Sequence, residues 1–289
     1  MRNLTPMPAQ LIDGKVLAAK VREEVAAEVE ELGDVGLTTV LVGDDPASDV
    51  YIRGKHKAAI GVGIRANDLR LSADIPEDEL LQLLADLNAD DAVDGILVQL
   101  PLPSHIDEVK AIEAIDPGKD VDGFHPINAG LLYLGRPNLV PGTPLGIMRM
   151  LAEYRIETKG ARAVVVGRSN IVGKPMAHLL LQAHATVTIC HSRTVDLQRH
   201  TLDADILVAA IGHLHVIGAD MVKAGATVID VGMNRTEDGL FGDVDPTAAE
   251  RAAYITPVPG GVGPMTIAML LKNTVTAARA RRGLVSGVT

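Results

Sequence analysis

The stretch Ala163-Val-Val-Val-Gly-Arg-Ser-Asn-Ile-Val-Gly-Lys-Pro175 joins an apolar run to a glycine turn and a helix start. Apolar, β-branched residues that end at a glycine are typical of a buried parallel strand before a tight turn. Gly173 and Pro175 then open a helical pattern, and a helix N-terminus favours a bound anion through its N–H groups and its dipole. The stretch therefore predicts a nucleotide-phosphate loop. Its spacing is G-R-S-x-x-x-G-x-P and not G-x-G-x-x-G, so an ordinary strand-to-helix turn is the alternative.

Strands and helices alternate on both sides of this stretch. The apolar pattern predicts helices at 15–32, 79–87 and 265–282, and further strands at 38–42, 95–100, 185–190, 205–211 and 227–231. This alternation is typical of the α/β class with parallel sheets. The section from Asp116 to Thr143 is rich in Gly, Pro, Asp and Asn, so we expect it to link two domains.

The composition excludes several classes of function. The chain has 289 residues, 47% of them hydrophobic, and a formal net charge of -10, which argues against a nucleic-acid or anionic-membrane partner. No apolar run approaches the roughly 18 residues of a membrane span. The first residues lack the apolar core of a signal peptide, so we expect a cytoplasmic protein. Cys190 is the single cysteine, so an intramolecular disulfide is excluded and we expect no metal site.

Tyr51 and Lys55 are four residues apart, so on a helix they share one face. A lysine beside a phenol can donate or accept a proton if burial lowers its pKa. The alternative is a solvated helix face, because Arg53 and Lys57 are close by. Tyr-x-x-x-Lys is also the catalytic pair of short-chain dehydrogenases. In that family the pair follows the nucleotide fold, whereas here it precedes the glycine turn, so the order argues against it.

Gln99 is the polar residue in an apolar strand pattern, and it lies near the carboxyl end of that strand. Ligands of parallel α/β sheets bind outside these ends, and an amide can both donate and accept there. A solvent-facing glutamine is the alternative. Asp120 and Asp122 lie in a turn, where aspartate commonly bonds its own backbone. One of the two carboxylates could instead accept hydrogen bonds from an amino-heterocycle.

The residues after the second strand of the nucleotide unit indicate the cofactor. An NAD-binding chain commonly has an acid there to hold the ribose 2′-hydroxyl, but this chain has Ser192 and Arg193, and Arg168 follows the glycine turn. These residues suit a 2′-phosphate, which predicts NADP. A surface arginine is the alternative at position 193. The Gly- and Pro-rich loop 257–264 allows close backbone approach to a ligand, although it would also be unremarkable as a connector.

These motifs occur in one order along nearly the whole chain, from about Leu11 to Ala278. They are Tyr51-Ile-Arg-Gly-Lys55, Asp94-Gly-Ile-Leu-Val-Gln-Leu-Pro-Leu-Pro103, Lys119-Asp-Val-Asp-Gly-Phe124, Ile127-Asn-Ala-Gly130, Gly167-Arg-Ser169, Val172-Gly-Lys-Pro175, Asp230-Val-Gly232 and Pro257-Val-Pro-Gly-Gly-Val-Gly-Pro-Met-Thr266. Together they closely resemble the bifunctional methylenetetrahydrofolate dehydrogenase/cyclohydrolase family. The last motif is the most specific of them.

The resemblance implies a two-domain homodimer with a cleft between its domains. A catalytic folate-binding domain would comprise residues 1–142, completed by the C-terminal helix within 265–289, and a Rossmann-type parallel-sheet NADP domain would comprise 143–264. The family oxidises methylenetetrahydrofolate with NADP and hydrolyses the methenyl product to formyltetrahydrofolate, a one-carbon interconversion that serves purine and amino-acid biosynthesis.

The resemblance also implies roles for individual residues. Lys55 would transfer the proton, Tyr51 and Gln99 would position it and the substrate, and Asp122 would hold the pterin ring. The cofactor would contact Gly167, Arg168, Ser169, Ser192, Arg193 and Met233. The folate would contact Tyr51, Gln99, Leu100, Pro101, Asp122, Gly261 and Pro264.

The chain departs from the family pattern at two positions. Pro141-Gly-Thr-Pro144 replaces the usual Pro-Cys-Thr-Pro, and Met233 stands where an aliphatic such as Ile is common. We expect activity to survive the first change and the backbone contact to the cofactor to survive the second. The residues leave three other functions open: a dehydrogenase of another small acid, a non-catalytic NADP-binding protein, and a monofunctional methylenetetrahydrofolate dehydrogenase.

Overall fold

The computed structural model describes residues 9–284 except residue 45, and the side chains of residues 46–51 are not described. The chain forms two compact units. The six-stranded unit contains the described residues up to Ala18 together with Thr143–Thr266, and the three-stranded unit contains Ala19–Gly142 together with the chain from Ile267 onward. Helices α1 (Gly14–Leu32) and α9 (Val262–Arg281) contribute residues to both units.

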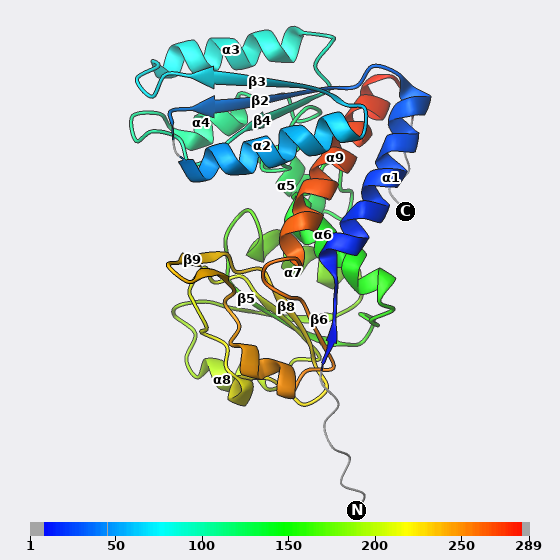
Figure 1. Cartoon of the computed structure of the whole chain (residues 1–289), viewed down its shortest axis with the longest axis vertical. Coiled ribbons are helices and arrows are strands. Elements are labelled where there is room, and N and C mark those ends of the chain that lie inside the picture. The colour runs from blue at the N-terminus through cyan, green and yellow to red at the C-terminus, as the bar shows by residue number, and fades with distance from the viewer. Residues whose placement is uncertain (1–8, 45, 285–289) are drawn as a thin grey trace, which may run out of the picture. The chain divides into compact units, whose positions relative to one another are not determined.

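The six-stranded unit is built on a parallel sheet (Figure 1). Its strand order is β1 (Gln10–Leu11), β11 (Tyr254–Ile255), β8 (Thr227–Asp230), β7 (Ile206–Ala209), β5 (Arg162–Val166) and β6 (Thr186–Cys190), and every pairing is parallel. The chain leaves β5 for β6 on one side and returns to β7 on the other side. In doubly wound sheets such a reversal of direction places a ligand crevice at the carboxyl ends of the two flanking strands, here β5 and β7.

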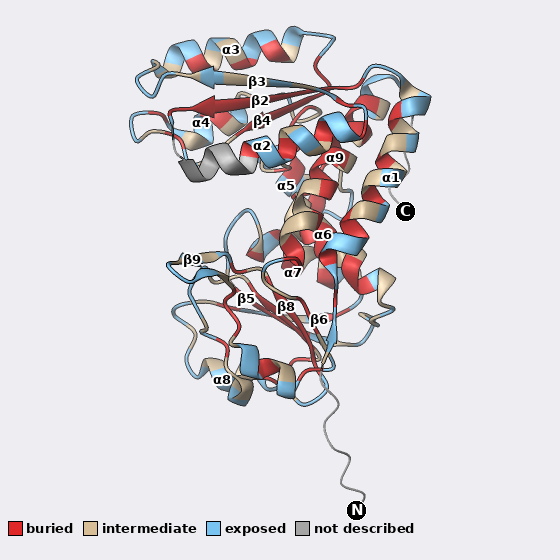
Figure 2. Ribbon diagram, in the orientation of Figure 1, coloured by how far each residue is buried: buried red, intermediate tan, exposed pale blue. Residues whose placement is uncertain are grey.

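The central strands of this sheet are buried because their residues are almost all aliphatic. Val164, Leu207 and Val228 belong to one apolar cluster beneath the loops, and Figure 2 shows these strands in the buried class. The helices and turns of the unit are α6 (Gly142–Glu153), α7 (Gly173–Gln182), α8 (Leu197–Thr201), η1 (Ala219–Met221) and η2 (Pro246–Glu250), with an antiparallel hairpin of β9 (Asn234–Thr236) and β10 (Gly239–Phe241).

The three-stranded unit has a parallel sheet in the order β3 (Arg65–Leu71), β2 (Gly36–Val42) and β4 (Gly95–Val98). Figure 1 shows α3 (Glu77–Ala89) on one side of this sheet and α2 (Pro46–Gly61) on the other. Leu80 and Leu84 of α3 pack against Val40 and Ile96 of the sheet. Two short helices, α4 (Glu108–Glu113) and α5 (Pro126–Tyr133), follow β4.

The structure confirms the α/β class and the parallel sheet. It also contains elements that the sequence pattern did not predict. Strand β3 has the sequence RANDLRL and lies at the sheet edge with most of its side chains partly or fully exposed, so it lacks an apolar signature. Helix α5 lies within the section expected to be an irregular link.

The N-terminal segment differs from the expected domain plan. Residues up to Ala18 are grouped with Thr143–Thr266, whereas the family resemblance implies a first domain of residues 1–142. The reason is strand β1, in which Gln10 and Leu11 pair with Tyr254 and Ile255 of β11 and so extend the larger sheet.

Candidate active site

Lys55 is a buried lysine on α2, with 5% of its surface exposed. Apolar neighbours in the helix, such as Ile52 and Ala59, lie on the same buried side, because residues three and four apart share a face. Burial lowers the pKa of Lys55, and the nearby charge of Asp122 partly restores it. The sequence left a solvated lysine as the alternative, and the structure instead shows a desolvated amine suited to proton transfer.

Gln99 follows the last residue of β4 and presents its amide to this lysine. The Lys55 Nζ donates to Gln99 Oε1 at 3.2 Å, and Gln99 Nε2 donates to the Leu100 carbonyl at 2.7 Å. The second bond fixes the orientation of the amide, because only the nitrogen can donate to a carbonyl. Gln99 therefore offers an acceptor to Lys55 whether the amine is charged or neutral.

Asp122 and Asp120 have different surroundings, although both lie in one turn. The Asp120 Oδ2 accepts from the backbone N–H of His125 and from Asn128 Nδ2, both within 2.9 Å, so Asp120 stabilises the turn. Burial raises the pKa of Asp122, and the charge of Lys55 lowers it. Of the two acids, Asp122 is thus the one that shares an environment with the buried amine.

Two further residues of this region were not singled out from the sequence. Asn273 of α9 is buried, and its Nδ2 donates to the carbonyls of Val121 and Val140 at 2.8 Å each, which holds the Asp122 turn against the helix. The only sequence signal was a polar residue within the apolar stripe of that helix. Lys119 donates to three carbonyls at and just after the end of α3, so it caps that helix.

The other residues expected to contact the folate are divided between the two units. Tyr51 lies in α2 one turn before Lys55, and its side chain is outside the described part of the structure. Leu100 and Pro101 follow Gln99, and Pro101 is exposed. Gly261 and Pro264 belong to the six-stranded unit, where Gly261 is buried and Pro264, in the first turn of α9, is half-buried.

The glycine turn after β5 leaves no room for a side chain. Gly167 has φ 132°, and a Cβ at this position would lie 2.1 Å from the carbonyl oxygen of Ala210, just after β7. A Cβ on Gly173 would lie 2.3 Å from the Gly167 carbonyl oxygen. The first turn of α7 therefore packs directly on the end of β5, next to the switch point of the sheet, which is where nucleotide-phosphate loops lie.

Polar side chains surround this turn. The Ser169 hydroxyl accepts from the N–H groups of Val172 at 3.1 Å and Gly173 at 3.3 Å, which orders the loop. Arg168 is exposed beside it. Ser192 and Arg193 are exposed in the turn after β6, and this turn is adjacent because the Gly167 N–H donates to the Cys190 carbonyl at 2.8 Å. Two arginines and two serines thus lie just after the carboxyl ends of two neighbouring strands, β5 and β6.

Met233 lies three residues after the carboxyl end of β8 and is 57% exposed. Its Sδ would lie 4.0 Å from a Cβ on Gly263, so Met233 lies beside the first turn of α9, at the end of the Gly- and Pro-rich stretch 257–264. Among the residues that the structure describes, no group of three or more His, Cys, Asp or Glu side chains could hold a metal ion. No helix in the described part of the chain is long and apolar enough to cross a membrane.

Comparison with known proteins gives the family. Residues 12–122 match the tetrahydrofolate dehydrogenase/cyclohydrolase catalytic domain, and residues 141–282 match the NAD(P)-binding domain of the same family. The bifunctional protein FolD of Paraburkholderia xenovorans is 59% identical over 278 residues, which are 94% of this chain and 97% of the relative.

Solved structures agree with this match. The bifunctional FolD enzyme of Campylobacter jejuni has a TM-score of 0.93 at 50% identity and covers 94% of this chain and 99% of its own. The methylenetetrahydrofolate dehydrogenase-cyclohydrolase of Trypanosoma brucei, solved with NADP and an inhibitor, has a TM-score of 0.90 at 39% identity, with coverages of 97% and 100%. The chain therefore belongs to the tetrahydrofolate dehydrogenase/cyclohydrolase family, with the catalytic and the NAD(P)-binding domain in one polypeptide.

Proposed function

We propose that Lys55, Gln99 and Asp122 form the reaction site of an NADP-dependent methylenetetrahydrofolate dehydrogenase that is also a methenyltetrahydrofolate cyclohydrolase. The enzyme acts in folate one-carbon metabolism. The observation that carries the assignment of residues is the buried Lys55 amine, which is hydrogen-bonded to Gln99 and electrostatically coupled to Asp122. An ordinary solvated lysine would have neither partner.

The cyclohydrolase step adds water to the methenyl carbon, and a proton must leave that water. Because burial lowers the pKa of Lys55, a larger fraction of this amine is neutral at pH 7 than of an exposed lysine, and the neutral Nζ can accept the proton. A bound methenyl cation would favour the neutral amine further, because like charges repel. Gln99 keeps the Nζ in place through its Oε1, and Asp122 offers carboxylate oxygens to the amino groups of a pterin ring.

The residues at the switch point fit NADP. The two glycines let the turn after β5 and the start of α7 pack closely on neighbouring backbone, and Ser169 orders the loop that leads into α7. Arg168 and Arg193 are exposed cations suited to a 2′-phosphate. When bound, NADP supplies the hydride acceptor for oxidation of the methylene carbon.

The proposed function is tested by incubating the protein with methylenetetrahydrofolate and either NADP or NAD. Reduced cofactor and methenyltetrahydrofolate are followed separately, and the chain contains no tryptophan to interfere. NADPH formation without lasting methenyl accumulation supports both activities. Lasting accumulation would leave only a dehydrogenase and remove Lys55 from the proposed role. Absence of turnover with either cofactor would overturn the proposal.

Arg168→Ala is expected to weaken NADP binding by about tenfold or more while changing NAD binding little, because a charged hydrogen bond to the 2′-phosphate is lost. Calorimetric titration with each cofactor measures the two affinities. Arg235→Ala, at an exposed position of β9, is the control and should change neither. Equal weakening of NADP and NAD would contradict the assignment of Arg168 to the 2′-phosphate.

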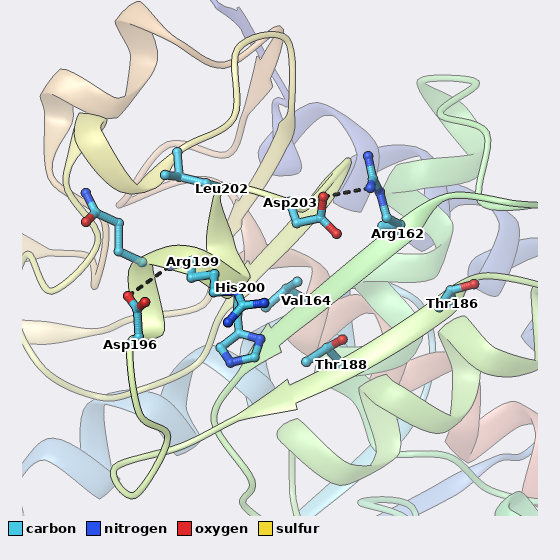
Figure 3. A pocket seen from close by; sticks show the side chains of 10 residues that line it. Arg162, Val164, Thr186, Thr188, Asp196, Arg199, His200, Leu202 and Asp203 are labelled. Carbon is cyan, nitrogen blue, oxygen red and sulfur yellow. Dashed lines mark hydrogen bonds and ion pairs between the residues drawn. The ribbon is translucent and has the colours of Figure 1, made fainter.

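We further propose that two copies of the chain associate through β6. This strand is the outer edge of the sheet, and an edge presents unpaired backbone groups that the same strand of a second copy can pair with. Ile189 in this strand is 44% exposed, and Val195 after it is 85% exposed. An open hollow of about 940 Å³ lies beside the strand. Figure 3 shows the side chains that line it, which include Thr186, Thr188 and Leu202.

Ile189→Lys is expected to convert the dimer to a monomer, because a charge on an edge strand opposes pairing with a second strand. Sedimentation velocity distinguishes the single chain of 30.4 kDa from twice this mass. Leu181→Lys in α7, where the wild-type side chain is 58% exposed, is the matched control and should remain dimeric. A monomeric parent protein, or a variant that stays dimeric, would reject this interface.

A further inference from the structure

Two buried carboxylates lie among the loops at the carboxyl ends of β7 and β8. Asp230 is the last residue of β8 and is 4% exposed, and Asp243, two residues after β10, is fully buried. Neither acid faces solvent, and neither belongs to the group around Lys55. Their hydrogen bonds go almost entirely to backbone N–H groups of the surrounding loops.

Asp243 binds the loop that follows β7. Its Oδ2 accepts from the N–H groups of Ile211 at 2.6 Å and Gly212 at 2.9 Å. Its Oδ1 accepts from the side-chain amide of Asn234 at 2.9 Å, at the start of the β9–β10 hairpin. One carboxylate therefore ties the end of β7 to the segment that follows β8.

Asp230 continues this network. Its Oδ1 accepts from the N–H groups of Gly232 and of Asp243, both at 2.9 Å, and its Oδ2 accepts from the Val244 N–H at 3.0 Å. Asp230 thus fixes the turn that leads to Met233 and also fixes the backbone of the second acid. The two carboxylates together hold the loops after β7 and β8 in one relative position.

The packing around the carboxylates is too close for side chains. A Cβ on Gly232 would lie 2.3 Å from Asp243 Oδ1, and a Cβ on Gly242 would lie 1.7 Å from Asp230 Oδ2. In both loops it is therefore the backbone of a glycine that lies directly against the carboxylate. The geometry is set by the carboxylates and not by apolar side chains that could repack.

The burial of these two carboxylates lowers the free energy of unfolding. Burial raises the pKa of Asp230 to about 6, and the charge of Asp243 contributes to this rise, although three backbone N–H groups act against it. Removing a carboxylate from water costs free energy that its hydrogen bonds only partly offset. Costly polar groups of this kind concentrate where a site must keep one geometry.

We propose that Asp243 and Asp230 are positioning residues for the cofactor, because they set the backbone of the loops that wall the NADP site at Gly212 and Met233. This inference rests on the proposed function. The loops lie at the carboxyl ends of strands next to the switch point, where a dinucleotide extends across the sheet. The acids act through the loops and contact neither cofactor nor substrate.

Asp243→Asn is the main test, because asparagine keeps the shape but leaves one acceptor oxygen for three donors. We expect the KM for NADP to rise about tenfold, and about a hundredfold for Asp243→Ala, in line with the loss of hydrogen bonds to a charged group. The KM for the folate and the cyclohydrolase rate, which needs no NADP, should stay within about twofold. Asp238→Asn, in the turn between β9 and β10, is the matched control and should change none of these values.

Asn234→Ala provides a milder variant in case the others fold poorly, since it removes one donor and keeps both backbone bonds of Asp243 Oδ2. It should raise the KM for NADP in the same direction by a smaller factor. Cyclohydrolase activity and NADP affinity that fall in parallel with thermal stability would show a purely structural role and overturn the inference. An unchanged KM for NADP in an active Asp243→Asn enzyme would overturn it as well. A parent protein that does not reduce NADP would instead reject the proposed function itself.

Discussion

Lys55→Met is expected to reduce the cyclohydrolase rate by at least about a hundredfold, the usual contribution of a general base. Methionine has a similar length and no charge, so the variant removes the proton acceptor without opening a cavity. It also removes a desolvated amine, which is why the fold should not be weakened. NADP affinity should be unchanged, because the nucleotide turn belongs to the other unit.

The rate is measured with methenyltetrahydrofolate alone, by the loss of its absorbance, so that hydride transfer does not enter. Lys57→Met is the matched control, because Lys57 is exposed two residues further along the same helix, and it should retain the parent rate. A Lys55→Met protein with a cyclohydrolase rate within a few fold of the parent would remove this lysine from the mechanism. Loss of NADP binding in the same variant would mean a damaged fold.

The spacing of Tyr51 and Lys55 predicted a common helix face, and the structure places both residues in α2. The sequence could not decide whether that face was buried, since Arg53 and Lys57 made a solvated face plausible. Burial of Lys55 comes from tertiary packing with groups far along the chain, at Gln99 and Asp122. A local pattern carries no information about such contacts.

For the two acids of the 118–123 turn, too, the sequence allowed two roles that the structure distinguishes. Asp120 and Asp122 both suited a turn or a ligand. The hydrogen bonds of Asp120 to His125 and Asn128, and the charge interaction of Asp122 with Lys55, separate their roles. Asp230 was noted only as part of a motif, and Asp243 was not noted at all. Their importance depends on loops that converge from β7, β8 and β10, which sequence periodicity does not reveal.

The fold was predictable where strands are apolar and central. The strands around the glycine turn are aliphatic because both faces of a parallel sheet are covered, and those predicted strands are present. Strand β3 was missed because an edge strand with Arg, Asn and Asp has no such signature. Strands β1 and β11 contain two residues each, too few for any period.

Gly167→Ala is expected to have the second large effect, on NADP affinity. The substitution meets two obstacles: a φ of 132°, which L-residues rarely adopt, and the Ala210 carbonyl oxygen 2.1 Å from the new Cβ. Backbone on both sides must move, and the turn that would hold the phosphates moves with it. We expect NADP to bind about a hundredfold more weakly, because a small displacement of a preorganised site has effects of this order.

Gly239→Ala separates the two obstacles. Gly239 has a φ of 139°, close to that of Gly167. The atom nearest to a Cβ on Gly239 would be a Phe241 ring carbon at 3.9 Å, which is an ordinary contact. Both variants therefore carry the conformational cost, and only Gly167→Ala carries the collision at the carboxyl ends of β5 and β7. Titration with NADP should show near-parent affinity for Gly239→Ala and strong weakening for Gly167→Ala, while cyclohydrolase activity confirms that each protein is folded. Equal affinities in the two variants would mean that the close approach of β5 and β7 does not shape the cofactor site. The phosphate loop would then have to lie after another strand, at the carboxyl ends of the same sheet.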